Sequence, residues 1–239
     1  VESRPYIDLT LSALADFGVT ARWLDERRLA VPGGQHYRPC SYRVEGDYSQ
    51  AAFPAVLGAV CGGVAVTGLR PDSLQGDAAI LDILARCGAN FTRTGDEVRF
   101  EASPLRATAI DLAACPDLGP ILMVLGLFCE GDTVITNAGR LRIKESDRIA
   151  AMQEELAKFG GQVLAEGETV TVKGLGGALC APTRPLNSHN DHRVAMALAI
   201  AAWAAGLPAC LEDAGAVAKS WPTFFADMAQ GLDARWQEA

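Results

Sequence analysis

The feature of this sequence that most constrains its fold is a pattern that returns about every 70 residues. One unit reads as an amphipathic helix, a glycine that ends it, and two strands joined by a tight turn. The glycines Gly18, Gly88 and Gly160 follow the helices, where a left-handed backbone is needed. The predicted helices cover residues 6–18, 77–88 and 147–160, and the strand pairs cover 19–24 with 28–32, 89–94 with 97–102, and 162–165 with 169–173. A fourth helix of this kind, over 222–230, is followed by Gly231.

A second unit alternates with the first and consists of an apolar helix followed by one strand. Its copies are predicted over 48–61 with 64–67, 118–129 with 133–136, and 193–205 with 209–212. An aspartate stands before each helix, at Asp47, Asp117 and Asp191, and aspartate is a favoured N-cap residue. The two units together predict α/β repeats of β-α-β-α-β-β type in a pseudo-threefold domain. Apolar helices in the middle and sheets around them would make it an inside-out α/β barrel.

The repeats are out of phase with the chain ends. The first unit starts in its second half, and no hairpin follows the helix over 222–230. The sequence also opens on Val1 without an initiator methionine. We therefore expect this chain to be part of a longer protein that supplies the remaining strands.

Composition excludes several classes of protein. The net charge of −8 and the lack of a basic stripe argue against a nucleic-acid partner. The seven cysteines form no C-x-x-C pair, so they predict reduced, buried thiols, such as Cys61, Cys87 and Cys129, in a cytoplasmic protein. No apolar run is long enough for a membrane span, so no membrane partner is expected.

Charged clusters stand where three of the helices begin. They are KESDR at 144–148, NDHR at 190–193 and Lys219 just before the last helix. Arg193 opposes the dipole of its own helix, so we expect it to have an anionic partner. Simple helix caps and a solvated charge run would explain parts of this pattern, and His192 alone would more often be structural. The whole set favours a site for phosphates and carboxylates.

These motifs resemble the 5-enolpyruvylshikimate-3-phosphate synthase family. The matching stretches are residues 3–10, 44–49, 73–77, 116–117, 142–148, 190–193 and 219–222. They run through the whole chain in the family's order, and the KESDR and NDHR pair is the most specific. The resemblance implies the enolpyruvyl transferase-like fold and a two-domain enzyme. Residues 1–44 would be the tail of the N-terminal domain, and 45–239 would be an incomplete C-terminal domain.

The resemblance also implies an activity, the transfer of the enolpyruvyl group of phosphoenolpyruvate to the 5-hydroxyl of shikimate 3-phosphate. Implied ligands of phosphoenolpyruvate are Arg148, Arg193 and Lys219, and implied ligands of shikimate 3-phosphate are Ser3, Tyr6, Lys144 and Asp117. Asp117 would take the hydroxyl proton, Glu145 would protonate and deprotonate the methylene carbon, and Asp47, Asp191 and His192 would support them. Two anionic substrates beside a carboxylate base would raise its pKa by like charge. The chemistry calls for no metal and no cofactor.

Alternative functions remain open at this point. The sister enzyme that transfers enolpyruvyl to UDP-N-acetylglucosamine would share the fold and the donor. RNA 3′-phosphate cyclase is built from related repeats but should be more basic. A chain that lacks the N-terminal domain and its substrate ligands is expected to be inactive by itself.

Overall fold

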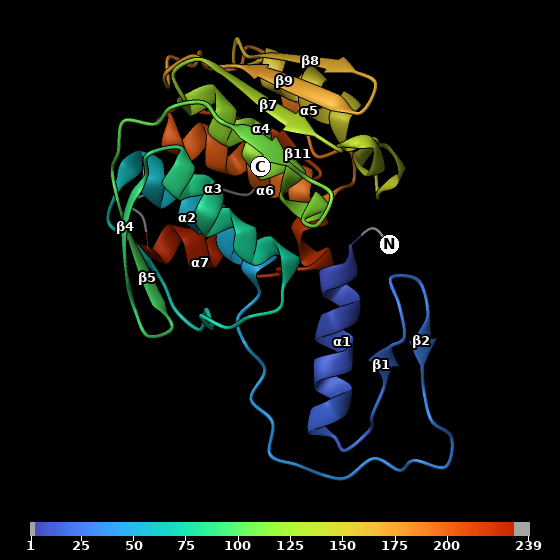
Figure 1. Ribbon diagram of the computed structural model, residues 1–239. Helices are drawn as coiled ribbons and strands as arrows, with labels where there is room; N and C mark the ends of the chain where they lie inside the picture. The colour runs from blue at the N-terminus through green and yellow to red at the C-terminus, as the bar shows by residue number, and fades with distance from the viewer. Residues whose placement is uncertain (1–2, 232–239) are drawn as a thin grey trace.

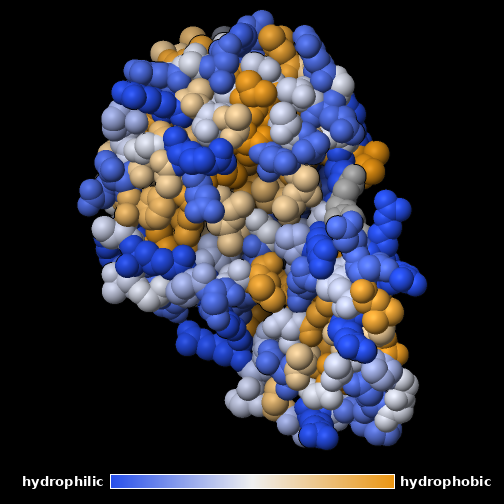
Figure 2. Space-filling model, in the orientation of Figure 1, coloured by the Kyte–Doolittle hydropathy of each residue, from blue (hydrophilic) through white to orange (hydrophobic). Residues whose placement is uncertain are grey.

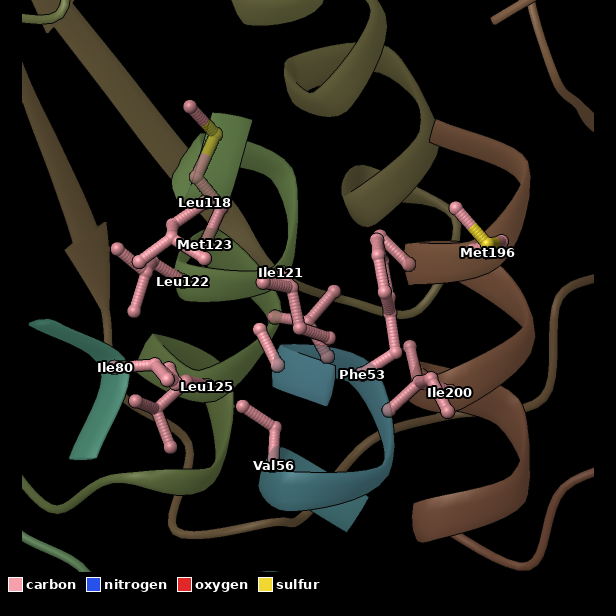
Figure 3. Close-up of a cluster of buried hydrophobic side chains, with 14 of the residues drawn as sticks. Phe53, Val56, Ile80, Leu118, Ile121, Leu122, Met123, Leu125, Met196 and Ile200 are labelled. Atoms are coloured by element: carbon pink, nitrogen blue, oxygen red, sulfur yellow. The ribbon is translucent and has the colours of Figure 1, made fainter. Parts of the chain in front are cut away.

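The computed structural model describes residues 3–231, and three apolar helices lie together in the middle of its larger part (Figure 1). They are α2 (Tyr48–Cys61), α4 (Gly119–Phe128) and α6 (His192–Ala204). Every residue of α4 is buried, as expected for a helix that is apolar on all sides. Figure 3 shows how Phe53, Ile121 and Ile200, one from each helix, lie in the same cluster of side chains. This helical centre confirms the predicted inside-out arrangement.

A four-stranded sheet packs against α4 and displays one complete repeat. Its elements are β6 (Ala109–Asp111), β7 (Asp132–Thr136), β8 (Gln162–Glu166) and β9 (Thr169–Lys173), with α5 (Arg148–Ala157) between β7 and β8. The strand order is β6-β7-β9-β8. The crossover pair β6 and β7 is parallel, and the hairpin β8–β9 is antiparallel. This is the β-α-β-α-β-β unit that the sequence predicts.

The neighbouring repeats have smaller sheets in the described part of the chain. One holds β3 (Val64–Val66), β4 (Asn90–Thr94) and β5 (Glu97–Glu101) in the order β3-β5-β4, with α3 (Ala79–Arg86) before β4. The other pairs β10 (Leu186–Asn187) with β11 (Leu211–Glu212) in parallel, and α7 (Phe224–Gly231) follows. Each short sheet keeps the pairing of the corresponding strands in the complete repeat.

The first residues form a separate lobe that projects from the body (Figure 1). It contains α1 (Arg4–Asp16) and the hairpin of β1 (Arg22–Trp23) and β2 (Leu29–Ala30). None of the residues of α1 is buried, although the helix has an apolar face. The lobe touches the body where α1 begins, and an extended segment, residues 31–47, returns the chain to α2.

Several local predictions can be compared with this structure. Gly18, Gly88 and Gly160 have φ of 80°, 86° and 84°, which confirms the predicted left-handed ends. The strands predicted over 28–32 and 209–212 are shorter than expected. All seven cysteines are free thiols, but the prediction of burial is wrong for four of them, because Cys40, Cys61, Cys180 and Cys210 are exposed. Among the residues described, no helix has the length and apolarity needed to cross a bilayer.

Gly126 of α4 packs directly against the sheet, so we expect Gly126→Ala to lower the free energy of unfolding by about 1–3 kcal/mol. A Cβ atom there would lie 2.9 Å from two side-chain atoms of Val172 in β9. Urea unfolding followed by circular dichroism would measure the loss. Gly33→Ala is the control, because a Cβ there meets nothing within 4 Å. Equal stability of the two variants would contradict this account of the packing.

Candidate active site

The aspartates before the central helices have two different roles. Asp47 caps α2, because its carboxylate accepts the N–H of Ser49, and Asp191 caps α6 in the same way through the N–H of Arg193. The N-cap prediction is wrong for Asp117, which lies inside a short 3-10 helix, η2 (Pro116–Leu118), before α4. Its carboxylate faces cationic side chains instead of backbone N–H groups. The departure from the repeat therefore marks Asp117 as a functional candidate.

Three cations surround the Asp117 carboxylate. One oxygen lies 3.1 Å from Lys144 Nζ and 3.0 Å from Arg148 Nη1, and the other lies 3.3 Å from Arg193 Nη2. Burial by itself would raise the pKa of Asp117, but the positive charges of Arg193, Lys144 and Arg148 outweigh it and hold the pKa below its ordinary value. In this arrangement Asp117 is ionised at neutral pH and can accept a proton.

Arg148 is more deeply buried than Asp117, since its side-chain exposure is 0% and that of Asp117 is 22%. It opens α5, whose N-cap is Asp147. Its guanidinium donates to Asp191 at 2.8 Å, to Asp117 at 3.0 Å and to Glu145 at 2.6 Å. Burial would raise the pKa of Asp191, but its hydrogen bonds and charge contact with Arg148 more than offset this and lower it. Arg148 thus fixes three carboxylates, of which Glu145 is the most exposed.

Arg193 joins the start of α6 to the start of α2. Its Nη2 donates to Ser49 Oγ at 3.0 Å. Its Nη1 is buried and makes no hydrogen bond to any residue between 3 and 231. A buried guanidinium N–H without an acceptor is costly, so it is suited to a ligand that supplies one. The N-termini of α2 and α6 add partial positive charge around the same point.

Lys219 and His192 contact the two neighbouring residues Asn190 and Asp191, respectively. Lys219 ends η4 (Ala214–Lys219), and its ammonium donates to the side-chain oxygen of Asn190 at 2.9 Å. Asn190 and Lys219 also line an open hollow on this surface. Burial and the neighbouring Arg193 charge lower the pKa of His192, which is therefore neutral at pH 7. A neutral imidazole in this position is consistent with a supporting role.

Ser3 and Tyr6 belong to the lobe, but both contact the body. The Ser3 hydroxyl accepts a hydrogen bond from Arg140 in η3 (Gly139–Ile143). The Tyr6 hydroxyl donates to the Asp77 carboxylate. Charge interactions reach from Tyr6 to Asp117 and Arg193. The structure therefore brings the predicted ligands of the lobe to the edge of the cationic cluster.

A possible metal-binding group lies elsewhere, beside β10. Oxygen and nitrogen atoms of Glu154, Glu155 and His189 lie within 4.8 Å of one another. The buried Glu155 carboxylate already accepts the Lys158 ammonium at 2.8 and 2.9 Å. That ammonium occupies the place of a cation, so this group is better explained as a structural ion pair.

A comparison with known proteins identifies the family to which this chain is similar. The family model described as EPSP synthase (3-phosphoshikimate 1-carboxyvinyltransferase) matches residues 1–228, nearly the whole chain. This chain belongs to the EPSP synthase family. Membership confirms the resemblance that the KESDR and NDHR motifs suggest.

Curated relatives in the EPSP synthase family extend beyond this chain. The 3-phosphoshikimate 1-carboxyvinyltransferase of Clostridioides difficile is 40% identical over 230 residues, which are 95% of this chain and 52% of that protein. The one from Clostridium beijerinckii is 41% identical over 228 residues, again 95% of this chain and 52% of the relative. This chain spans about half the length of the curated relatives it matches.

Solved structures show the same fold. The EPSP synthase of Acinetobacter baumannii superposes with a TM-score of 0.81 at 25% identity, over 94% of this chain and 53% of that one. The enolpyruvyl transferase NikO of Streptomyces tendae gives a TM-score of 0.73 at 22% identity, over 96% and 53%. The enolpyruvyl transferase fold that the resemblance implies is thereby confirmed.

Sequence reasoning missed two residues that the structure of this family member places at the site. Arg140 contacts Ser3, and Asp77 contacts Tyr6. Asp77 lies in the stretch 73–77 that carries part of the resemblance, but nothing in its sequence surroundings assigns it a role. The sequence around Asp77 and the sequence around Tyr6 each lack any pattern that predicts their long-range contact.

Proposed function

We propose that this protein is the C-terminal part of an enzyme that transfers the enolpyruvyl group of phosphoenolpyruvate to the 5-hydroxyl of shikimate 3-phosphate, with release of phosphate. The observation that supports it most is Asp117, an ionised carboxylate held between Lys144, Arg148 and Arg193. Such a site combines a base with cations for anionic substrates. Membership in the EPSP synthase family agrees with this reading.

We assign phosphoenolpyruvate to Arg193, Lys219 and Arg148. Arg193 offers the buried Nη1 that lacks an acceptor in the described chain, and a carboxylate or phosphate would supply one. Lys219 stands at the open hollow beside Asn190. Arg148 is enclosed by carboxylates, so a ligand reaches it by replacing Glu145, its most exposed partner.

We assign shikimate 3-phosphate to Ser3, Tyr6, Lys144 and Asp117. In the addition step Asp117 takes the proton of the 5-hydroxyl, the oxygen bonds to the central carbon of phosphoenolpyruvate, and Glu145 gives a proton to the methylene carbon. In the elimination step Glu145 takes a proton back from that carbon, the double bond forms again, and phosphate leaves together with the proton that Asp117 had taken, which restores both carboxyl groups. Two bound anions would compensate the cations around Asp117 and so raise its pKa, which makes it a stronger base when both substrates are present.

We further propose that residues 1–44 end an N-terminal domain, that 45–239 form most of the C-terminal domain, and that the N-terminal domain supplies further substrate ligands. The helix α1 buries none of its residues. Large apolar side chains such as Val31, Tyr37 and Val44 are 66%, 67% and 81% exposed, and apolar surface on this lobe is visible in Figure 2. A partner domain would cover that surface. The free thiols support a cytoplasmic location.

A phosphate-release assay tests the function. The natural full-length protein should release phosphate from phosphoenolpyruvate when shikimate 3-phosphate is added, and not when UDP-N-acetylglucosamine is added. Asp117→Asn keeps the side chain's shape but not its basicity, so it should lower kcat by about 10²–10⁴-fold. The 239-residue chain alone should release none. Turnover with UDP-N-acetylglucosamine instead would contradict the substrate, and full activity of the chain alone would contradict the two-domain site.

A further inference from the structure

Asp77 is a buried carboxylate that the proposed mechanism does not use. It lies in the 3-10 helix η1 (Gly76–Ala78), which leads into α3, and it is 2% exposed. One of its oxygens accepts the Tyr6 hydroxyl, and the other has no hydrogen-bond partner in the part of the chain that the structure describes. A carboxylate buried with an unpaired oxygen is unusual, and it is costly in the ionised form.

The groups that face Asp77 come from every element around it. They are Tyr6 of α1, Cys115 and Asp117 near η2, Asp47 at the start of α2, and Arg193 of α6. Burial, together with the Asp117 and Asp47 charges, raises the pKa of Asp77 to about 6, although the Tyr6 hydrogen bond and the Arg193 charge oppose the rise. Arg193 is also held by Asp117 and Ser49. A new negative charge nearby would favour the protonated form of Asp77.

The state of Asp77 decides what Tyr6 offers to a substrate. Burial and the Asp77 charge raise the pKa of Tyr6, so its phenol keeps its proton. While Asp77 is ionised, Tyr6 donates its single O–H to that carboxylate, and its oxygen can only accept a hydrogen bond from a substrate. Once Asp77 is protonated, its own O–H can donate to the Tyr6 oxygen. The phenol O–H is then free to donate to a phosphate ester.

We propose that Asp77 is a positioning residue that couples binding of the phosphorylated acceptor at Tyr6 to the uptake of one proton. The proton passes from solvent to the Asp77 carboxylate, and no covalent bond of the substrate changes. This inference rests on the proposed function, since it takes shikimate 3-phosphate as the ligand of Tyr6.

Calorimetry of shikimate 3-phosphate binding to the natural full-length protein tests the coupling. Titrations at pH 7 in two buffers of different ionisation enthalpy give the number of protons taken up. Wild type should take up more protons than Asp77→Asn, by up to about one. Titration of the substrate's own phosphate contributes equally to both proteins, so it drops out when the two uptakes are subtracted. The Kd of shikimate 3-phosphate should also be measured as a function of pH. Above pH 6.5 the ratio of the wild-type Kd to the Asp77→Asn Kd should rise by up to about tenfold per pH unit.

Two further variants keep the test falsifiable. Asp82→Asn removes an exposed carboxylate from the adjoining helix α3 and should behave as wild type. Tyr6→Phe removes the coupled hydroxyl, so it should lose the extra proton uptake even if Asp77→Asn does not fold. Tight binding with equal uptake in wild type, Asp77→Asn and Tyr6→Phe would overturn the inference and leave the proposed function intact. Failure of wild type to bind shikimate 3-phosphate would overturn both.

Discussion

Replacing Arg193 by alanine in the full-length protein should raise the KM for phosphoenolpyruvate by about a hundredfold or more, because a charged, two-pronged contact to an anion is worth about 3 kcal/mol. The Kd of shikimate 3-phosphate should change far less. Arg193 holds a buried Nη1 without an acceptor among the described residues, next to the N-terminus of α6. Steady-state kinetics gives the first quantity and calorimetry the second.

Arg193→Lys separates the charge from the geometry of the guanidinium. Lysine keeps the positive charge beside Asp117 but cannot bind a carboxylate with two parallel hydrogen bonds. We therefore expect an intermediate KM for this variant. Equal losses of phosphoenolpyruvate and shikimate 3-phosphate binding in Arg193→Ala would contradict the assignment of Arg193 to one substrate.

The fold was largely predictable from the sequence because its signals are local and repeated. The apolar helix predicted over 48–61 has those bounds in the structure, and the turn glycines have the expected left-handed φ values. Strand lengths at the ends of the chain were less predictable, as β2 and β11 show. Short strands depend on neighbouring strands for pairing, and a pattern within one segment does not reveal its neighbour.

The candidate site was predictable in its members but not in its connections. The motifs placed Arg148, Arg193 and Asp117 at helix starts, yet the repeat suggested that Asp117 is a cap like Asp47. The choice between a cap and a charge cluster is made by Lys144 and Arg148, near the start of the second helix of the same repeat, and by Arg193 of the next repeat. Asp77 went unnoticed for the same reason, since its partner Tyr6 lies 71 residues away.

Arg148 is the side chain whose loss should cost the fold most within the site. It is fully buried, and so is Asp191, with which it shares hydrogen bonds of 2.8 and 3.3 Å. Removal of one partner of a buried ion pair leaves the other charge without compensation, which costs about 3–5 kcal/mol. Arg148→Met keeps much of the volume, so we expect the loss of unfolding free energy to come from charge and not from a cavity.

Urea unfolding at pH 7 should show this loss for Arg148→Met, whereas Arg142→Met should cost at most about 1 kcal/mol, because the contact of Arg142 with Asp147 is solvent-exposed.

In wild type the pKa values of Asp117 and Asp191 are lowered, so the stability that these carboxylates contribute is present above the unfolded pKa and is lost as the pH falls through the folded values. In Arg148→Met the uncompensated Asp191 should prefer its protonated form, so that variant loses stability as the pH rises. The gap in unfolding free energy between wild type and Arg148→Met should therefore narrow from pH 7 to about pH 4. Adding Asp191→Asn to Arg148→Met should recover part of the lost stability. A gap that is independent of pH and of Asp191 would show that Arg148 stabilises the domain through packing instead of charge.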